Sequence, residues 1–525
     1  MHGSVPSHRT RPIFDDGPGT SPAWRPRISH FYRRHFQRHP PRAVLAVLAT
    51  GAFTFFMILY LLFFARRTEE NPPPLTPPPP YDDGPGRPEF YPWDTTSLFH
   101  PVKLYAKGKD ADDLCPSFPH HLLQSIQPVL KIGHADVGKP TFEAQLASAS
   151  ACLGDDLLIF SDLDEHDLPG NRSAYDVLAD LPASYRHHAD FGNYTYMRDL
   201  RDAGALDVDK AATAAIRGWV IDKYKFLPMV ERAWAMRPGR DWYVFYETDT
   251  YVSWDNMFRF LGNLDPDSPL YIGSPSPGRV VPDTDTVTWF ANGGPGFVLS
   301  RAAMRRFLAR QVGAQGDFLE APQSHRWADL LDIDCCGDSV LGWALWTAGV
   351  PLSGFWPLFN PDSLHGVGFN DDHWCQPVLT LHKTTPEDMI ELWRWEHSNR
   401  QHNKPLLYRD LYQFYRPGQI ETRADWDNRE PKALEAPDTV DSFEACGVAC
   451  DQNPECFQWN WHAGKCLLVR SIRHGSPRAA AKPDENGQGG GAYMSGWASE
   501  RIAAWRSART CDVVGWVRPS ITRIF

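Results

Sequence analysis

Residues 241–251 have the sequence Asp-Trp-Tyr-Val-Phe-Tyr-Glu-Thr-Asp-Thr-Tyr, an apolar run that ends abruptly in two carboxylates. The run from Trp242 to Tyr246 lacks polar alternation, which is typical of a strand buried on both faces of a parallel α/β sheet. Ligands of open α/β sheets bind beyond the carboxyl ends of the strands, where Glu247 and Asp249 fall. Two carboxylates there could hold a divalent cation that bridges nucleotide phosphates. Taken alone, the pair is better explained as an acidic turn, so the choice depends on the surrounding motifs.

The composition favours a multidomain protein and argues against a nucleic-acid binder. The chain has 525 residues, enough for two or three domains with a sizeable core. Its formal net charge is −11 and no basic stripe lies outside the N-terminal tail, so no nucleic-acid partner is expected. Twenty tryptophans and 13% aromatic residues suit a carbohydrate-binding surface, and they equally suit a large core.

One uncharged segment, residues 43–64, predicts the compartment. It is long enough to cross the ~30 Å hydrocarbon core of a bilayer as a helix. Many arginines precede it, whereas Glu69 and Glu70 follow soon after, so the positive-inside bias keeps the disordered tail 1–42 in the cytosol. A cleaved signal peptide is the alternative, but the segment is long for one and lacks a small-residue cleavage site. We therefore expect a single-pass type II membrane protein with a lumenal body in which disulfides form.

The sequence after this anchor changes from a stem to a folded body. Residues 65–113 are rich in proline and predict an extended stem. The body begins near residue 114 with a strand, a helix and a strand, which predict a βαβ unit. These three elements are expected at 128–133, 142–152 and 157–160. A helical pattern at 211–236, with a kink or boundary at Pro228, precedes the central strand. Later strands are expected at 269–272, 286–290 and 297–299, with a loop at 273–283.

Three motifs follow the central strand in a fixed order. Paired glycines in Ala291-Asn-Gly-Gly-Pro-Gly296 let a backbone approach a ligand, although they serve a tight turn equally well. Asp338 stands at the head of an apolar helix, where helix capping is an ordinary role of aspartate. His382 ends an apolar strand, and a lone histidine of this kind is more often structural. Each motif alone is better explained by a structural role, and only their combination indicates a function.

Together the motifs resemble the fringe-like β-1,3-glycosyltransferases of glycosyltransferase family 31, over residues 114–400. The family's strand-terminal acidic motif is matched by Glu247-Thr248-Asp249-Thr250-Tyr251, and its Gly-Gly-Ala-Gly segment by Gly293-Gly-Pro-Gly296. Asp338 matches the family's acidic helix start, His382 its late metal-binding histidine, and Lys225 a lysine on the helix before the motif strand. Glu247 departs from the pattern, since the family usually has aspartate there. Its longer side chain could coordinate through water or could alter the metal dependence.

This resemblance implies a fold, a reaction and a set of residue roles. The fold would be α/β of the glycosyltransferase A type, a Rossmann-like mixed sheet with helices on both faces. The reaction would move a hexosyl or N-acetylhexosaminyl group from a UDP-sugar to a glycan or glycoprotein with inversion, in β-1,3 linkage. Mn²⁺ or another divalent cation would neutralise the leaving diphosphate. Asp338 would be the general base, with Asp334 and Asp332 as fallbacks. The metal ligands would be Glu247, Asp249 and His382, the donor contacts Asp162, Lys225, Thr248 and Asp249, and the acceptor contacts Trp289, Phe290, Gly293 and Gly294.

Four cysteines cluster near the C-terminus, at 446, 450, 456 and 466. Zinc binding is a competing interpretation, but a CxxC knuckle is absent. The first two cysteines would share one face of a helix, with strands behind it at 457–461 and 493–497. Residues 425–515 resemble the PAN/apple module, a small disulfide-rich α+β fold, placed after a linker at 401–424 and before a tail at 516–525. This resemblance implies the disulfides Cys446–Cys466 and Cys450–Cys456, and a protein or carbohydrate ligand for the module.

The remaining cysteines and two sequons add further expectations. We expect a Cys115–Cys152 bridge and one from Cys335 or Cys336 to Cys375. The sequons Asn171-Arg-Ser and Asn193-Tyr-Thr predict N-glycosylation, which requires the lumen.

The leading prediction is therefore a type II Golgi-membrane glycosyltransferase with a lumenal catalytic domain. The alternative is a catalytically degenerate, membrane-tethered protein that binds carbohydrate or protein through the PAN module. Glu247 favours this alternative, whereas the joint presence of Asp249, Asp338 and His382 disfavours it. A retaining glycoside hydrolase ranks third, because no pair of carboxylates that would face one glycosidic bond is evident.

Overall fold

The structure is a computed structural model that describes residues 90–92, 115–206, 218–399, 404–415, 421–430, 433–436, 439–482, 490–512 and 514–521. The expected cytosolic tail, the expected anchor at 43–64 and most of the expected stem lie outside these residues. Among the described residues, no helix combines the length and the apolar character needed to cross a membrane.

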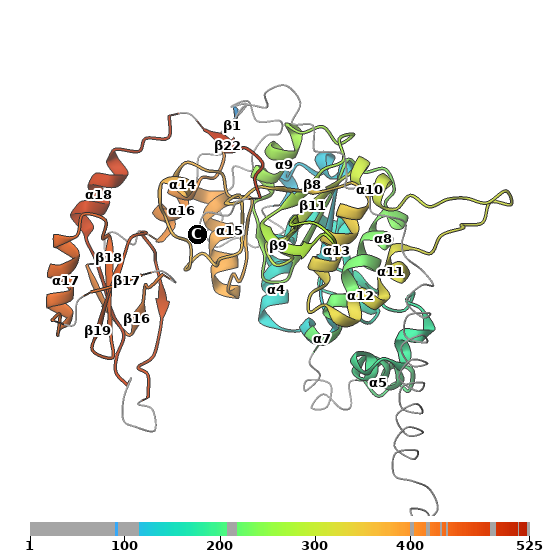
Figure 1. The fold of residues 1–525 in the computed structure, drawn as a ribbon, viewed down its shortest axis with the longest axis horizontal. Coiled ribbons are helices and arrows are strands. Elements are labelled where there is room, and N and C mark those ends of the chain that lie inside the picture. Colours follow the sequence, from blue (N-terminus) through green and yellow to red (C-terminus); the bar gives the residue numbers. More distant parts are fainter. Residues whose placement is uncertain are drawn as a thin grey trace, which may run out of the picture. The chain divides into compact units, whose positions relative to one another are not determined.

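An eight-stranded mixed sheet forms the centre of the body (Figure 1), with the strand order β12-β8-β11-β6-β2-β3-β5-β4. Its strands are β2 (Ile126–Lys131), β3 (Leu158–Ser161), β4 (Glu165–Leu168), β5 (Arg172–Asp176), β6 (Trp242–Glu247), β8 (Tyr271–Gly273), β11 (Phe297–Ser300) and β12 (Leu352–Gly354). Strands β6, β2, β3 and β5 pair in parallel, whereas β11 runs antiparallel to both β6 and β8. The expected βαβ unit is confirmed, because β2 and β3 flank helix α4 (Pro140–Ala147).

The central strand β6 is buried on both faces, as its composition predicts. Tyr243 and Phe245 belong to one core with residues of α8 (Phe226–Met236) and α13 (Gly337–Thr347). Trp242, Val244 and Tyr246 belong to a second core with residues of α4 and α9 (Trp254–Gly262). Because side chains alternate along a strand, helices therefore cover both faces of the sheet. This arrangement confirms the α/β prediction and fits a glycosyltransferase A-like fold.

The helix before β6 breaks close to Pro228, as the sequence predicts, whereas one expectation for the segments after β6 needs correction. The long helix expected before it is broken into α7 (Trp219–Asp222), a 3₁₀ turn (Lys223–Lys225) and α8, while residues 207–217 lie outside the described part. Pro228 lies in the first turn of α8, where the missing N–H costs nothing. The loop expected at 273–283 contains strand β9 (Pro275–Val280), which forms a hairpin with β10 (Val287–Ala291). Its prolines are tolerated because this two-stranded hairpin lies outside the main sheet.

A small three-stranded sheet lies after the acidic motif. It consists of β13 (Phe359–Asn360), β14 (Thr380–Leu381) and β7 (Tyr251–Val252), in that order. Because Leu381 pairs with Tyr251, the sheet carries the residue after Leu381 back to the end of β6.

Parts of the expected linker at 401–424 form regular structure among the residues that the structure describes. Residues 408–415 form α16, in which Tyr408, Leu411 and Tyr412 are buried in a third core, so the linker prediction is wrong there. Residues 422–424 form β15, which pairs with β21 of the C-terminal module. In α16, burial of the apolar face outweighs the polar residues of the segment.

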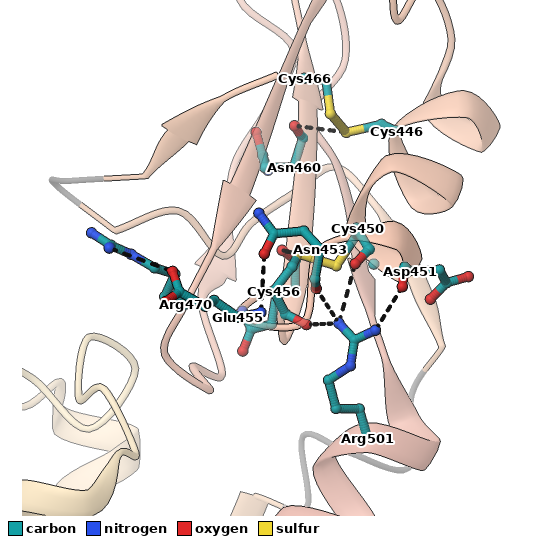
Figure 2. Close-up of a disulfide and its surroundings, with 12 residues drawn as sticks. Cys446, Cys450, Asp451, Asn453, Glu455, Cys456, Asn460, Cys466, Arg470 and Arg501 are labelled. Carbon is teal, nitrogen blue, oxygen red and sulfur yellow. Dashed lines mark hydrogen bonds and ion pairs between the residues drawn. A yellow bond between two sulfur atoms is a disulfide. The ribbon is translucent and has the colours of Figure 1, made fainter. Parts of the chain in front are cut away.

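The C-terminal module has a five-stranded antiparallel sheet with the order β15-β21-β18-β19-β17. Beyond β15 its strands are β17 (Leu434–Glu435), β18 (Gln458–His462), β19 (Lys465–Val469) and β21 (Met494–Trp497). Helix α17 (Phe443–Gln452) packs against it through Cys446–Cys466 and Cys450–Cys456, the pairing that the PAN/apple resemblance implies. Arg501 of α18 (Ser499–Ser507) donates to four backbone carbonyls at or just after the end of α17 (Figure 2). These bonds tie α18 to the C-terminal end of α17 and to the loop that follows it.

Five disulfides pair all ten cysteines. Cys115–Cys152 is present as expected. The expected bridge to Cys375 from Cys335 or Cys336 is wrong, because Cys335 and Cys336 bond to each other and Cys375 bonds to Cys511. The adjacent pair lies just before α13, whereas Cys375 directly follows α14 (Asp371–Trp374), which packs against α18 through Trp374 and Trp505.

A segment of the expected stem pairs with a segment near the C-terminus. Strand β1 (Phe90–Pro92), within the expected stem, lies antiparallel to β22 (Gly515–Val517), at the start of the expected tail.

Candidate active site

Glu247, Asp249 and His382 gather at the end of the central strand. Each offers a ligand atom that lies within 4.8 Å of the other two, and His382 Nε2 is 3.4 Å from Asp249 Oδ1. The pairing of β14 with β7 explains how a residue more than a hundred positions away reaches Asp249. Two carboxylates and an imidazole form a donor set that fits a divalent cation such as Mn²⁺.

The glycine turn packs directly against this cluster. A Cβ on Gly294 would lie 2.1 Å from Cε1 of His382, so no other residue fits without displacing the imidazole. Thr250 Oγ1 donates to the Gly294 carbonyl at 2.6 Å, which ties the turn to the acidic motif. Gly296 has a φ of 81° and closes the turn with a backbone hydrogen bond to Gly293.

Asp338 lies on the other side of the same turn. Its Oδ2 accepts a hydrogen bond from the Gly293 backbone N–H at 2.8 Å, and its Oδ1 accepts one from Ser339 N–H at 2.9 Å. The N-cap of α13 is Cys336, so the capping explanation for Asp338 is wrong. Burial raises the pKa of the Asp338 carboxyl, and the nearby charge of Glu247 adds to this increase, whereas the two N–H donors oppose it. A partly buried carboxylate with a raised pKa is suited to accept a proton.

The two fallback aspartates are engaged elsewhere. Asp334 forms an ion pair with Arg279 and accepts hydrogen bonds from Cys336 N–H at 3.0 Å and Ser339 Oγ at 3.1 Å. Asp332 accepts from the Tyr224 hydroxyl at 3.3 Å. Asp334 therefore anchors the start of α13, which leaves Asp338 as the carboxylate that faces the glycine turn.

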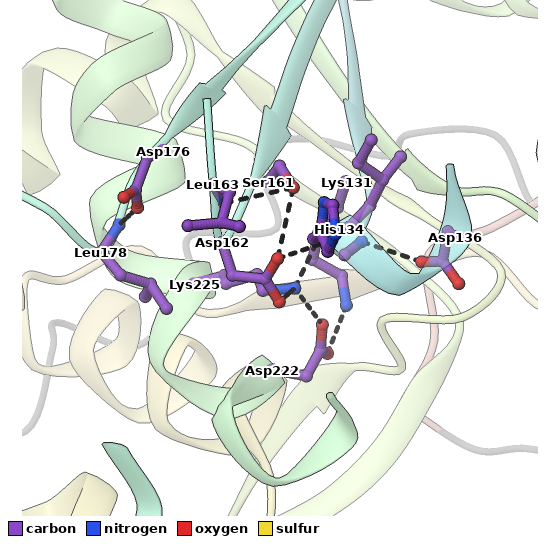
Figure 3. A network of polar contacts seen from close by, with 12 residues as sticks. Lys131, His134, Asp136, Ser161, Asp162, Leu163, Asp176, Leu178, Asp222 and Lys225 are labelled. Carbon is purple, nitrogen blue, oxygen red and sulfur yellow. Dashed lines mark hydrogen bonds and ion pairs between the residues drawn. The ribbon is translucent and has the colours of Figure 1, made fainter. Parts of the chain in front are cut away.

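A chain of alternating charges extends from the acidic motif, and Figure 3 shows its part from Lys131 to Asp162. Lys131 Nζ lies 3.0 Å from Glu247 Oε1 and also contacts Asp222. Lys225 Nζ lies 3.4 Å from Asp222 Oδ1 and 3.2 Å from Asp162 Oδ2. Burial alone would lower the pKa of both lysines, but the carboxylates outweigh it and hold both pKa values above the usual range.

Asp162 and Lys225 do not lie open to a donor nucleotide, since each is only 1% exposed. Asp162 Oδ1 accepts from His134 N–H at 2.6 Å, and Lys225 Nζ donates to the Ile132 carbonyl at 2.8 Å. In this structure both residues hold the loop that follows β2, so their expected contact with the donor stays a prediction.

Sequence reasoning missed Lys131 and Asp222. Lys131 is paired in register with Glu247, one strand away in the parallel sheet. A lysine at the end of the apolar strand 126–131 was the available signal, because it stands at the same sheet edge as Glu247 and Asp249.

The positions of the other residues with expected roles do not test those roles. Thr248 is partly buried between the two acidic residues of its motif. Phe290 packs tightly against α13, where a Cβ on Gly342 would lie 2.2 Å from the Phe290 Cβ, and Trp289 packs against the first core. Both aromatic side chains remain partly exposed, so their contact with an acceptor stays a prediction. Asn171 and Asn193 are exposed, as glycosylation requires, and their modification likewise stays a prediction.

Comparisons with known proteins point to one family. Residues 212–350 match the family model described as Fringe-like. The β-1,3-N-acetylglucosaminyltransferase lunatic fringe of Bos taurus is 29% identical over 121 residues, which are 21% of this chain and 31% of the relative. The Fringe glycosyltransferase of Drosophila melanogaster is 29% identical over 104 residues, 18% of this chain and 25% of the relative. The chain therefore spans less than a third of the length of these curated relatives.

The large mixed sheet, with a cluster of candidate metal ligands at the end of its central strand, fits a glycosyltransferase A-like fold. Within that fold class, residues 212–350 are fringe-like, which confirms the resemblance to glycosyltransferase family 31. The matched range includes the acidic motif, the glycine turn and Asp338, whereas His382 lies beyond it.

Proposed function

We propose that this protein is an inverting, divalent-metal-dependent glycosyltransferase that uses a UDP-sugar. One observation carries the proposal. Two consecutive glycines contact the candidate base and a candidate metal ligand. Gly293 N–H donates a hydrogen bond to Asp338, and Gly294 lies against His382. The turn thereby fixes a candidate base beside a candidate metal site, as in-line displacement requires.

Each side chain has a defined part in this proposal. Asp249 and His382 would hold the metal, with Glu247 at the edge of the same cluster. When bound, a divalent cation supplies Lewis-acid neutralisation of the departing diphosphate. Asp338 Oδ2 accepts the proton of the acceptor hydroxyl while that oxygen attacks the anomeric carbon from the face opposite the leaving group, which inverts the configuration. The hydrogen bond from Gly293 N–H orients the carboxylate for this transfer.

We further propose a lumenal site for the body, in the Golgi, behind a type II anchor at residues 43–64. The complete pairing of the cysteines supports an oxidising compartment, and the exposure of both sequon asparagines is consistent with it. The C-terminal module, with its PAN/apple-like disulfides, would bind a glycan or protein and present it to the same enzyme.

The purified full-length chain should be incubated with a panel of UDP-hexoses and UDP-N-acetylhexosamines, with and without Mn²⁺. We expect release of UDP from a subset of donors, abolished by EDTA and restored by Mn²⁺. The same preparation should be titrated with UDP by calorimetry. If the protein neither releases UDP nor binds it, the proposal is contradicted. In that case, glycan or protein binding by the C-terminal module alone would favour a degenerate, membrane-tethered binding protein.

A further inference from the structure

Lys131 forms a salt bridge with the first acidic residue of the metal cluster. It is the last residue of β2, stands in register with Glu247, and places its Nζ 3.0 Å from Glu247 Oε1. Glu247 is one methylene longer than aspartate, and its carboxylate contacts Lys131 on the neighbouring strand. The residue that departs from the family motif, Glu247, is thus the one that is paired with the ammonium group of Lys131.

Burial and a second ion pair hold the Lys131 ammonium group in place. Lys131 is 7% exposed, and its second partner Asp222 is itself held by Lys225 at 3.4 Å. Lys225 is in turn paired with the buried Asp162 (Figure 3). The chain from Glu247 to Asp162 alternates in sign at every step, so each lysine is held between two carboxylates.

We propose that Lys131 is a positioning residue that holds Glu247 out of direct metal coordination, which leaves Asp249 and His382 to set the metal affinity. The ammonium group competes with the metal ion for the Glu247 carboxylate. The resulting site binds a divalent cation more weakly than its three candidate ligands would on their own. This inference rests on the proposed function, because it concerns the same metal site.

A double-mutant cycle with Mn²⁺ alone as the probe tests it. Calorimetry on the full-length chain would compare the wild type, Glu247→Gln, Lys131→Met and the double variant. We expect Glu247→Gln alone to change Mn²⁺ affinity less than about threefold, and Lys131→Met to tighten it by about tenfold or more. In the double variant the gain should be lost, because the freed Glu247 is its source.

Lys225→Met is the matched control. It removes another buried lysine of the same network, but one with no contact to Glu247, so Mn²⁺ affinity should not rise. An equal and large loss of Mn²⁺ affinity on Glu247→Gln in both backgrounds would overturn the inference, since Glu247 would then be a direct ligand whatever Lys131 does. If Lys131→Met does not fold, the large loss in the single Glu247→Gln variant overturns the inference by itself.

The two proposals fail in different ways. If the wild type and Lys131→Met both bind no Mn²⁺, the inference is wrong whatever the transfer assay gives. If the cycle behaves as expected while no donor is turned over, the proposed function is wrong and the inference about Lys131 stands.

Discussion

The Asp338 carboxylate carries the mechanistic part of the proposal, and its two hydrogen bonds from backbone N–H groups separate a chemical role from a structural one. Asn at this position keeps the size of the side chain and one acceptor oxygen, which can retain the hydrogen bond from Gly293 N–H. It cannot take up a proton. Asp338→Asn should therefore bind UDP and Mn²⁺ like the wild type yet lose transfer by on the order of 10²–10⁴-fold. Transfer rates would be measured beside UDP titrations, and undiminished transfer would show that Asp338 is not the base.

The pH dependence of transfer follows from the direction of the Asp338 pKa shift. Burial raises the pKa of this carboxyl, with Glu247 adding to it, so the base is protonated over a wider acidic range than an exposed aspartate. Activity should thus fall on acidification at a pH above the ordinary aspartate pKa of about 4. The acid limb of kcat/KM measures this, because it reports the free enzyme. An acid limb at or below pH ~4 would contradict the assignment of Asp338.

At the scale of elements, the glycine turn between β10 and β11 organises the site. Gly294→Ala would bring its Cβ within 2.1 Å of His382 Cε1, so the imidazole has to move away from Asp249. We expect Mn²⁺ affinity to fall by about tenfold or more, since one of the few ligands is displaced. Gly192→Ala, where nothing lies within 4 Å of the new Cβ, is the matched control and should bind Mn²⁺ like the wild type. Equal Mn²⁺ affinity in the two variants would show that the turn does not position His382.

Sequence patterns predicted those elements whose signal is local. The run 242–246 and the strand–helix–strand unit at 128–160 appear nearly as expected, because both depend on burial of contiguous apolar residues. Helix α16 and the hairpin of β9 were missed, because tertiary packing overrides their polar or proline-rich composition. The order of the motifs along the chain was sufficient to predict that Asp249, Asp338 and His382 lie around one site. The Lys131–Asp222 contact was not predictable, because it joins the end of a strand to the end of helix α7 across 91 positions of sequence.

At the scale of the whole molecule, the C-terminal module shares a core with the body. Ile472, Trp497 and Ile502 belong to the same buried cluster as Leu364, Trp374 and Tyr412, and Phe369 forms a β-bridge with Ile472. A module that contributes to a common core differs from one joined by a flexible linker. Its loss would expose apolar surface of the body.

The Cys375–Cys511 bridge should contribute strongly to the free energy of unfolding of the body and the module that share this core. It joins positions separated by 136 residues, so loop-closure entropy predicts that Cys375→Ser/Cys511→Ser loses on the order of 5 kcal/mol of unfolding free energy. Cys450→Ser/Cys456→Ser opens a bridge with a separation of 6 and should lose on the order of 2 kcal/mol. Chemical denaturation of both double variants measures the difference. A smaller loss for the long bridge than for the short one would contradict the view that it holds the module to the body.

Calorimetric titration of UDP into the wild type and Asp249→Ala, each with and without Mn²⁺, tests the central claim most directly. Asp249 is partly exposed and its side chain pairs with His382, so its truncation should leave the fold intact, as a thermal melt would verify. The wild type should bind UDP markedly more tightly with Mn²⁺, because the metal joins the diphosphate to the protein. Asp249→Ala should lose this Mn²⁺-dependent gain. The same gain in the variant would contradict the account, because the metal site would then not lie at the end of the central strand.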